Sequence, residues 1–137
     1  MALYELLFKS AIKASESPNS PIPWYKKAKT VCKSYSAKTR GQYGVHHKIY
    51  LIMLKGVDGE KPGYALYVGQ TGLTPEERFQ RHKNGVQSSG VVRKYGKRLL
   101  PDLYKHLNPM SYEESMKLEH DIFQALVKAG VPVHGGH

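Results

Sequence analysis

Cysteine and long apolar runs are what this chain most clearly lacks. Cys32 is the only cysteine among 137 residues, so no internal disulfide can form, and a disulfide-stapled secreted scaffold is excluded. No apolar run approaches the roughly 20 residues that a membrane-spanning helix needs, and acidic Glu5 stands where a signal peptide would be basic. We therefore expect a soluble protein of the reducing cytoplasm.

Acidic side chains are also scarce. Against 21 Lys and Arg the chain has 11 Asp and Glu, and its formal net charge is +10. This balance favours a polyanionic partner, because lysine and arginine contact phosphates and release their condensed counterions. Nucleic acid, and DNA first, is the natural candidate. The alternative is a small basic protein whose charges only keep it in solution.

Several common site motifs are missing as well. The chain has no phosphate-cradling P-loop, no dinucleotide fingerprint, no Ser–His–Asp pattern and no internal repeat. Its histidines, including the pairs His46 with His47 and His134 with His137, lack the cysteine and histidine spacing of a structural zinc site. A zinc protein is therefore not expected.

What the chain does contain is a pair of short apolar segments joined by turn residues. Residues 48–54, KIYLIML, are rich in β-branched and aromatic side chains, which predicts a strand. Residues 64–68, YALYV, predict a second strand, and the glycine- and proline-rich loop between them indicates an antiparallel hairpin. The two-residue period of a strand places Tyr67 on the face opposite Leu66 and Val68.

A helix start signal follows the second strand. Thr74 and Glu77 have the spacing of a capping box, and Pro75 falls at the first helical position, where its missing N–H costs nothing. The helix should run over residues 75–84, with Gly85 as its C-terminal stop.

Two residues of this helix, Arg78 and His82, are four positions apart and share one face, so both can point at one phosphate. With the strands before them they resemble the GIY-YIG nucleases, a family named for two strand motifs that precede a helix carrying an arginine and often a histidine. The motifs appear here as Lys48-Ile49-Tyr50 and Tyr67-Val68-Gly69. Lys48 stands where the family name has its first glycine.

The resemblance covers about residues 48–129 and implies a metal-dependent DNA endonuclease that hydrolyses phosphodiester bonds with Mg²⁺ or Mn²⁺. The catalytic residues that it implies are Tyr50, Tyr67, Arg78, His82 and Glu119, with Glu119 as the metal ligand. Tyr50 is the family-style general base, and His82 is the alternative because an unperturbed histidine titrates close to neutrality. Many relatives carry an asparagine near the C-terminus, where this chain has His134.

The position of Glu119 on its predicted helix indicates a buried carboxylate with a partner, independently of the resemblance to the nuclease family. Ser111 and Glu114 form a second capping-box pattern, which predicts a helix to about residue 129. Glu119 borders the apolar stripe of that helix, and a buried carboxylate needs a partner. The partner is either an arginine in a salt bridge or Mg²⁺, which accepts one carboxylate and leaves its other positions to water and phosphate.

A third strand at about residues 97–100 completes the predicted fold. We expect an α/β protein, an α+β sandwich with a small, mainly antiparallel three-stranded sheet flanked by helices, as in the GIY-YIG family. Residues 1–45 are predicted to be a helical and basic N-terminal extension packed on or linked to the core, with helices over residues 2–13 and 24–35. Residues 46–137 are predicted to form the nuclease-like domain, and the short segment 131–137 is a candidate to return to the sheet edge.

The basic residues predicted to contact nucleic acid lie in the extension, on the central helix and in the stretch before the third strand. They are Lys26, Lys27, Lys29, Arg40, Arg81, Arg93, Lys94, Lys97 and Arg98. Aromatic residues near the first of them suit stacking on exposed bases. The alternatives are a solvated helical face and an exposed loop. Tyr64 and Tyr112 are expected to be ordinary packing residues.

Two other functions stay open at this level. One is a nucleic-acid-binding module that keeps the fold without catalysis, and the other is a basic RNA-associated protein. A homodimer is also open as an assembly.

Overall fold

The computed structural model describes residues 22–57 and 63–135, so the predicted helix over residues 2–13 lies outside the described residues. Helices and strands follow one another along the chain. They are α2 (Tyr25–Lys33), β1 (Lys48–Lys55), β2 (Tyr64–Thr71), α3 (Pro75–Lys83), α4 (Gly90–Tyr95), β3 (Gly96–Leu99), the 3-10 helix η2 (Pro101–Leu103), α5 (Tyr112–Lys128) and β4 (Val133–Gly135).

The strands form one sheet in the order β3-β1-β2-β4. The three predicted strands are present, and β1 pairs antiparallel with both β2 and β3. The described chain adds β4, which runs parallel to β2, so the sheet has four strands and mixed pairing where the sequence predicted three antiparallel strands. The segment 131–137, a candidate to return to the sheet edge, does so through β4. It was not counted among the predicted strands, because three residues carry too little pattern to identify a strand.

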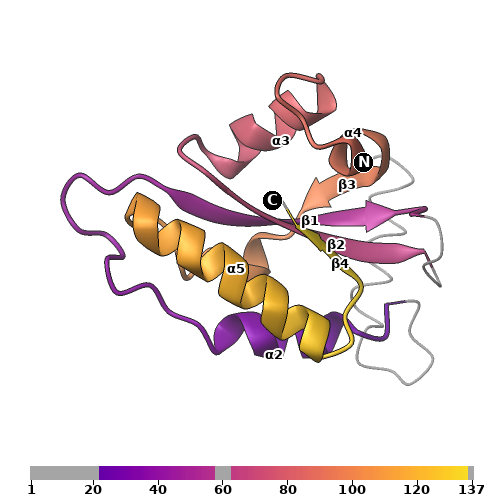
Figure 1. Cartoon of the computed structure of the whole chain (residues 1–137), viewed down its shortest axis with the longest axis horizontal. Helices are drawn as coiled ribbons and strands as arrows, with labels where there is room; N and C mark the ends of the chain where they lie inside the picture. Colours follow the sequence, from indigo (N-terminus) through magenta and orange to yellow (C-terminus); the bar gives the residue numbers. More distant parts are fainter. Residues whose placement is uncertain (1–21, 58–62, 136–137) are drawn as a thin grey trace.

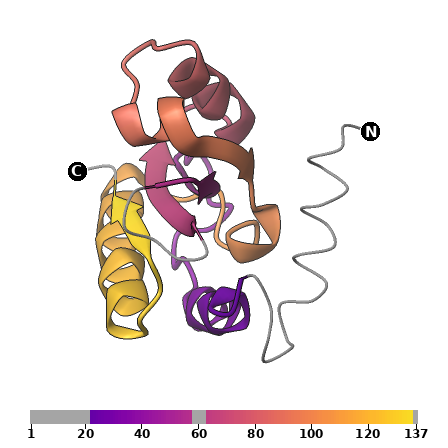
Figure 2. The same ribbon diagram turned by 90° about the vertical axis from the view of Figure 1, so that its right-hand side faces the viewer.

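Helices cover both faces of this sheet. Figure 1 shows α3 and α4 above it and α5 and α2 below it, and the turned view in Figure 2 shows the same two layers. β1 and β2 are buried over almost their whole length. A strand covered on both faces needs apolar residues at successive positions, which explains why the KIYLIML and YALYV segments do not alternate. The protein is therefore α+β, with a four-stranded mixed sheet flanked by helices.

The helices beside the site differ in how well the sequence predicts them. α3 has the predicted start, with a complete capping box and Pro75 in its first turn. α4 was not predicted, since residues 91–98 were treated as a basic stretch or exposed loop. It has only six residues, no side-chain cap and two β-branched valines. Lys83 of α3 stabilises the C-terminal end of α4 by donating to the carbonyl oxygens of Arg93 at 3.0 Å and Gly96 at 2.9 Å.

The start of α5 has only half of the predicted capping box. The Ser111 hydroxyl accepts the N–H of Glu114 at 3.2 Å, as the pattern predicts. The Glu114 carboxylate, however, accepts the backbone N–H groups of Lys38 and Thr39 at 2.7 and 2.8 Å, and the Thr39 hydroxyl at 2.5 Å. Three donors from a distant loop thus replace the single local donor of a capping box.

α2 is shorter than the predicted helix over residues 24–35. It buries Tyr25, Ala28 and Cys32 in the core beneath the sheet. Among the described residues, no helix has the length and apolar character needed to cross a membrane.

Candidate active site

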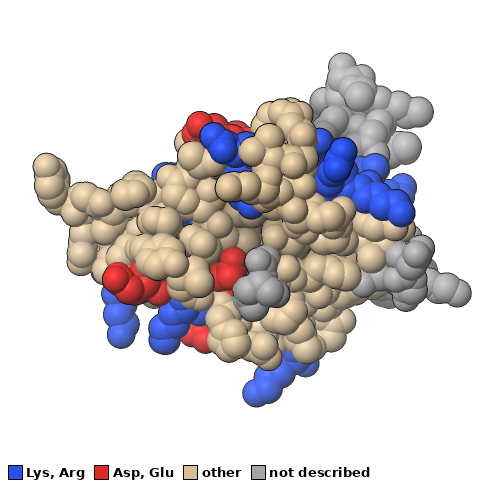
Figure 3. All heavy atoms as spheres, turned by 45° about the horizontal axis from the view of Figure 1, so that its top comes forward, with Lys and Arg blue, Asp and Glu red and all other residues tan. Residues whose placement is uncertain are grey.

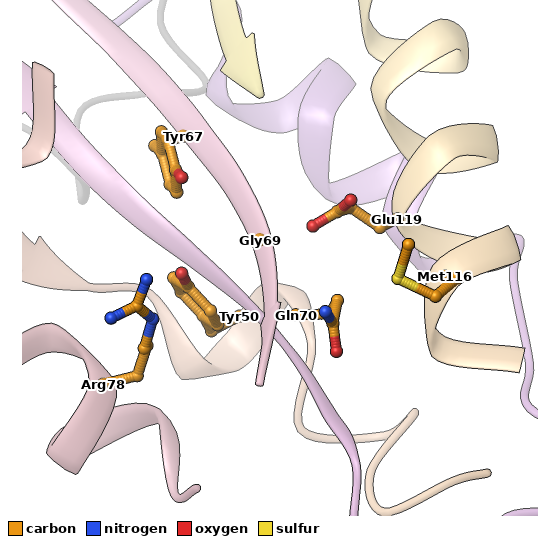
Figure 4. Close-up of a pocket in the computed structure, with 7 residues that line it drawn as sticks. All are labelled: Tyr50, Tyr67, Gly69, Gln70, Arg78, Met116 and Glu119. Carbon is orange, nitrogen blue, oxygen red and sulfur yellow. The ribbon is translucent and has the colours of Figure 1, made fainter. Parts of the chain in front are cut away.

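A pocket of about 180 Å³ opens beside the end of β2 (Figure 4). Its lining comes from two strands of the sheet, β1 and β2, and from one helix on each side of it, α3 and α5. The lining residues are Tyr50, Tyr67, Gly69, Gln70, Arg78, Met116 and Glu119. Arg78 belongs to α3 above the sheet and Glu119 to α5 below it, so the pocket joins the two helical layers.

Gly69 makes this junction possible. It pairs with Tyr50 across the β1–β2 ladder, and a Cβ atom built on it would lie 2.5 Å from the Tyr50 hydroxyl oxygen. Any side chain would therefore push the Tyr50 ring away. Among the described residues, the pairing of β2 with β4 extends as far as Val68 and Gly135. Figure 4 shows the Glu119 carboxylate pointing toward Gly69 from the other side of β2.

Tyr50 and His82 form a buried hydrogen-bonded chain that ends on the backbone. The Tyr50 hydroxyl lies 2.9 Å from His82 Nε2, and His82 Nδ1 accepts the Ser89 N–H at 3.0 Å. Burial, followed by the nearby Arg78 charge, lowers the pKa of His82 to about 4, so the ring is neutral at pH 7. Because Nδ1 accepts, we assign the ring proton to Nε2, which donates it to the Tyr50 oxygen.

The two tyrosines of the site have raised pKa values. Burial is the largest cause for both, and the Glu119 carboxylate adds to it. Arg78 acts in the opposite direction on both, since its charge favours the phenolate. The rings of Tyr50, Tyr67 and His82 have centroids 5.7 to 6.2 Å apart, which fixes both phenols against the histidine. At neutral pH both tyrosines therefore keep their protons.

One hydrogen bond anchors the Arg78 side chain and leaves other guanidinium donors for a ligand. Its Nη2 donates to the Gln87 carbonyl oxygen at 2.9 Å. The guanidinium is half-buried, and Figure 4 shows it beside the Tyr50 ring at the pocket. With five N–H donors, one spent on Gln87, it has others for a planar anion such as a phosphate.

Glu119 is 5 % exposed and lines the pocket, as its position on the helix predicted. The described residues contain no group of three or more His, Cys, Asp or Glu side chains that could hold a metal ion. A metal in this pocket would therefore have one carboxylate ligand from the described part of the chain. That donor set suits Mg²⁺, which keeps several waters and shares its remaining positions with substrate phosphates.

The fold thus brings four of the five predicted site residues to one pocket: Tyr50, Tyr67, Arg78 and Glu119. The fifth, His82, lies behind Tyr50 and is fully buried. Sequence reasoning missed Gln70 and Met116. Gln70 directly follows the second motif, and Met116 stands three residues before Glu119 on the same helix, so their neighbours in the sequence were the available signal.

The predicted nucleic-acid contacts do not form one surface. Lys26, Lys27 and Lys29 belong to α2, below the sheet, whereas Arg81, Arg93, Lys94 and Lys97 belong to α3, α4 and β3, above or beside it. Arg98 is half-buried, and Arg40 donates to the Asn108 carbonyl oxygen at 3.3 Å. Figure 3 shows basic side chains gathered at the end of the molecule where α4 and β3 lie.

Tyr112 also differs from its prediction as a packing residue, because it is 53 % exposed, while Tyr64 is buried as expected.

No family model, curated protein or solved structure matches this chain. What the site can do is therefore inferred from its geometry. A guanidinium, a buried carboxylate and two phenols around one polar pocket are suited to binding a phosphate together with a divalent cation.

Proposed function

We propose that this protein is a metal-dependent DNA endonuclease that hydrolyses phosphodiester bonds through a GIY-YIG-type site. One observation carries the proposal: Arg78 and Glu119, from helices on opposite faces of the sheet, line the same pocket as Tyr50 and Tyr67. The net charge of +10 supports a polyanionic substrate.

Arg78 binds the scissile phosphate in this proposal. The Gln87 carbonyl holds the guanidinium in place before substrate arrives. Preorganised donors stabilise charge that develops on phosphate oxygens without having to reorganise during the reaction. Tyr67, whose ring packs edge-on against His82 with centroids 5.7 Å apart, orients the phosphate or the attacking water.

Tyr50 is the proposed general base. His82 is less suited to this role, because Ser89 occupies Nδ1 and the proton on Nε2 is donated to Tyr50. His82 instead positions Tyr50 and stabilises its phenolate. In the proposed step, a water oxygen bonds to phosphorus while the opposite P–O bond breaks. The water proton passes to the Tyr50 phenolate, and the departing oxygen takes a proton from solvent.

Glu119 would hold Mg²⁺ or Mn²⁺ in the pocket. The ion would neutralise phosphate charge and stabilise the departing oxygen. The rest of its coordination would come from water and the substrate, which is the arrangement that Mg²⁺ commonly adopts.

A second function is favoured by one observation. Burial raises the pKa of Tyr50, which keeps the proposed base protonated at neutral pH. A binding module of the same fold without catalysis is compatible with that protonation state. The two candidates differ at alkaline pH, where an active enzyme gains phenolate and a binding module gains no cleavage. The RNA-associated alternative has no such observation in its favour.

Nicking of supercoiled plasmid by the purified full chain tests the proposal. With Mg²⁺ at about pH 9 we expect nicked circles, and with chelator we expect none. Glu119→Gln and Arg78→Ala should each slow nicking at least ~100-fold. Glu113→Gln, on an exposed carboxylate of the same helix, is the matched control and should nick normally. Nicking that persists unchanged in both site variants would reject the proposed site.

A further inference from the structure

A cluster of rings lies beside the pocket and takes no part in the proposed reaction. The His46 and His47 rings have centroids 5.1 Å apart, and the Tyr112 ring meets His47 edge-on at 5.0 Å. We call His46, His47 and Tyr112 the ring cluster. Two backbone hydrogen bonds between His47 and Met110, at 3.0 and 2.8 Å, fix the chain that carries the histidines. The cluster is also open to solvent, since His46 and Tyr112 are both exposed.

Gln70 connects the ring cluster to the pocket. Its Oε1 lies 3.2 Å from His47 Nδ1, and Gln70 itself lines the pocket. An amide oxygen only accepts, so His47 Nδ1 is the donor. The Gln70 amide nitrogen is then available on the pocket side, where Figure 4 shows it nearer to Gly69 than the amide oxygen is.

Helix α5 also connects the ring cluster to the pocket, independently of Gln70. Tyr112, Met116 and Glu119 stand at positions i, i+4 and i+7, so they lie on one face of the helix. Met116 and Glu119 line the pocket. At a rise of about 1.5 Å per residue, Tyr112 is about 10 Å along the helix from Glu119. The exposed ring therefore lies within reach of a nucleotide next to a phosphate in the pocket.

A cation stands beside these rings. Lys48 Nζ donates to the His46 carbonyl oxygen at 2.7 Å. Rings next to a fixed positive charge are the combination that binds single-stranded nucleic acid, where aromatic side chains stack on bases and cations follow the backbone.

We infer that the ring cluster is a stacking platform for one unpaired base adjacent to the phosphate in the pocket. The inference rests on the proposed function, in that the pocket holds a phosphate, and it adds the substrate class: DNA that is single-stranded or locally unpaired at the site. A base inside a continuous duplex is stacked on both neighbours and offers no free face to Tyr112. The enzyme therefore prefers single strands, flaps or unpaired junctions to plain duplex.

The test is direct binding in chelator, so that no cleavage is needed. Fluorescence anisotropy of the full chain is measured with a short labelled DNA single strand and with the duplex of the same sequence. We expect the single strand to bind at least ~10-fold more tightly. Tyr112→Ala should weaken single-strand binding roughly 5- to 100-fold, as loss of one stacked base predicts, and leave duplex binding within about twofold.

Matched variants separate stacking from folding. Tyr112→Phe keeps the ring and should keep the affinity. Val127→Ala removes a side chain of the same helix that is 50 % exposed and not part of the pocket lining, and should change nothing. His47→Ala removes the ring between His46 and Tyr112 and should weaken single-strand binding like Tyr112→Ala. Equal loss on single strand and duplex, or no loss in either ring variant, would overturn the inference.

Failure here is distinguishable from failure of the proposed function. Ring-dependent single-strand binding by a protein that never nicks DNA supports the platform and rejects the nuclease. Metal-dependent nicking by a protein whose binding ignores Tyr112 and His47 supports the nuclease and rejects the platform.

Discussion

The two helices that carry the charged residues of the site begin with the same sequence pattern, but their N-termini are capped differently. At the start of α3, Thr74 and Glu77 bond to each other's backbone and complete a capping box. At the start of α5, the Ser111 hydroxyl accepts the Glu114 N–H as in a capping box, but the Glu114 carboxylate accepts the N–H groups of Lys38 and Thr39 instead of that of Ser111.

The difference shows how each half of the site is positioned. α3 is organised by contacts within its first turn, and Arg78 and His82 follow from that local geometry. α5 is held by a segment more than seventy residues earlier in the chain. The position of Glu119 therefore depends on tertiary structure, whereas the position of Arg78 depends mostly on the local sequence.

Substitution within α3 should give the largest effect. Arg78→Lys keeps the charge but loses the planar donor fork, and we expect a loss of ~10²- to 10³-fold in kcat for nicking. Gln80→Ala, on an exposed residue of the same helix outside the predicted contacts, should change kcat less than about threefold. A wild-type rate in Arg78→Lys would mean that this residue supplies charge alone.

The pH dependence of nicking next tests Tyr50 of β1, which His82 of α3 positions. In the proposed mechanism Tyr50 acts as the phenolate, and burial raises the pKa of Tyr50 above the ordinary value of 10. The phenolate fraction, and with it kcat, should rise about tenfold per pH unit between pH 7 and 9. Tyr50→Phe should remove this rise. A wild-type profile that is flat over that range would contradict Tyr50 as base.

The buried histidine of α3 should also affect stability. The folded pKa of His82 is about 4 and the unfolded value is about 6.5, so the unfolded state binds the extra proton. The contribution is fully present above pH 6.5 and is lost as pH falls toward 4, by up to about 3 kcal/mol.

Urea unfolding at several pH values measures this loss. His82→Phe should remove this part of the acid dependence, and His120→Gln, on an exposed histidine of α5, should retain it. An identical acid dependence in His82→Phe and the unmodified chain would show that His82 does not titrate as described.

The smallest effects come from the two caps themselves. Glu114→Ala removes the acceptor for three donors of the 38–39 loop and should destabilise the fold by about 1–2 kcal/mol. Glu77→Ala disturbs an exposed box and should cost less. Denaturant midpoints of the two variants measure the two losses of stability. A larger loss of stability in Glu77→Ala than in Glu114→Ala would contradict the conclusion that α5 depends more on tertiary contacts than α3 does.

The sequence predicted the elements whose signals are local. The first two strands and α3 were identified from apolar runs, the turn between them and the Thr74–Pro75–Glu77 start, and their observed bounds differ from the prediction by a few residues. α4 was missed because it is short and is stabilised by a neighbour, Lys83. The return of segment 131–137 to the sheet edge was expected, but the short β4 within it was not predicted as a strand, because its pairing with β2 is not a local signal.

The same division applies to the site. Tyr67 and Gly69 could be singled out because they belong to a motif, and Arg78 because of its helical spacing. Nothing local indicated that Gly69 would leave room for Tyr50 or that Ser89 would fix the His82 ring. These facts arise where segments far apart in the chain meet.

Paramagnetic broadening by Mn²⁺ tests the central claim most directly, since Mn²⁺ replaces Mg²⁺ at oxygen sites. In an NMR titration of the isotope-labelled full chain, the backbone amides of Gly69 and Gln70 and the side chain of Arg78 should broaden first. Glu119→Gln should abolish this effect, while Glu113→Gln should not. Broadening that begins elsewhere, or that is unchanged in Glu119→Gln, would contradict a metal and phosphate site joining α3 and α5.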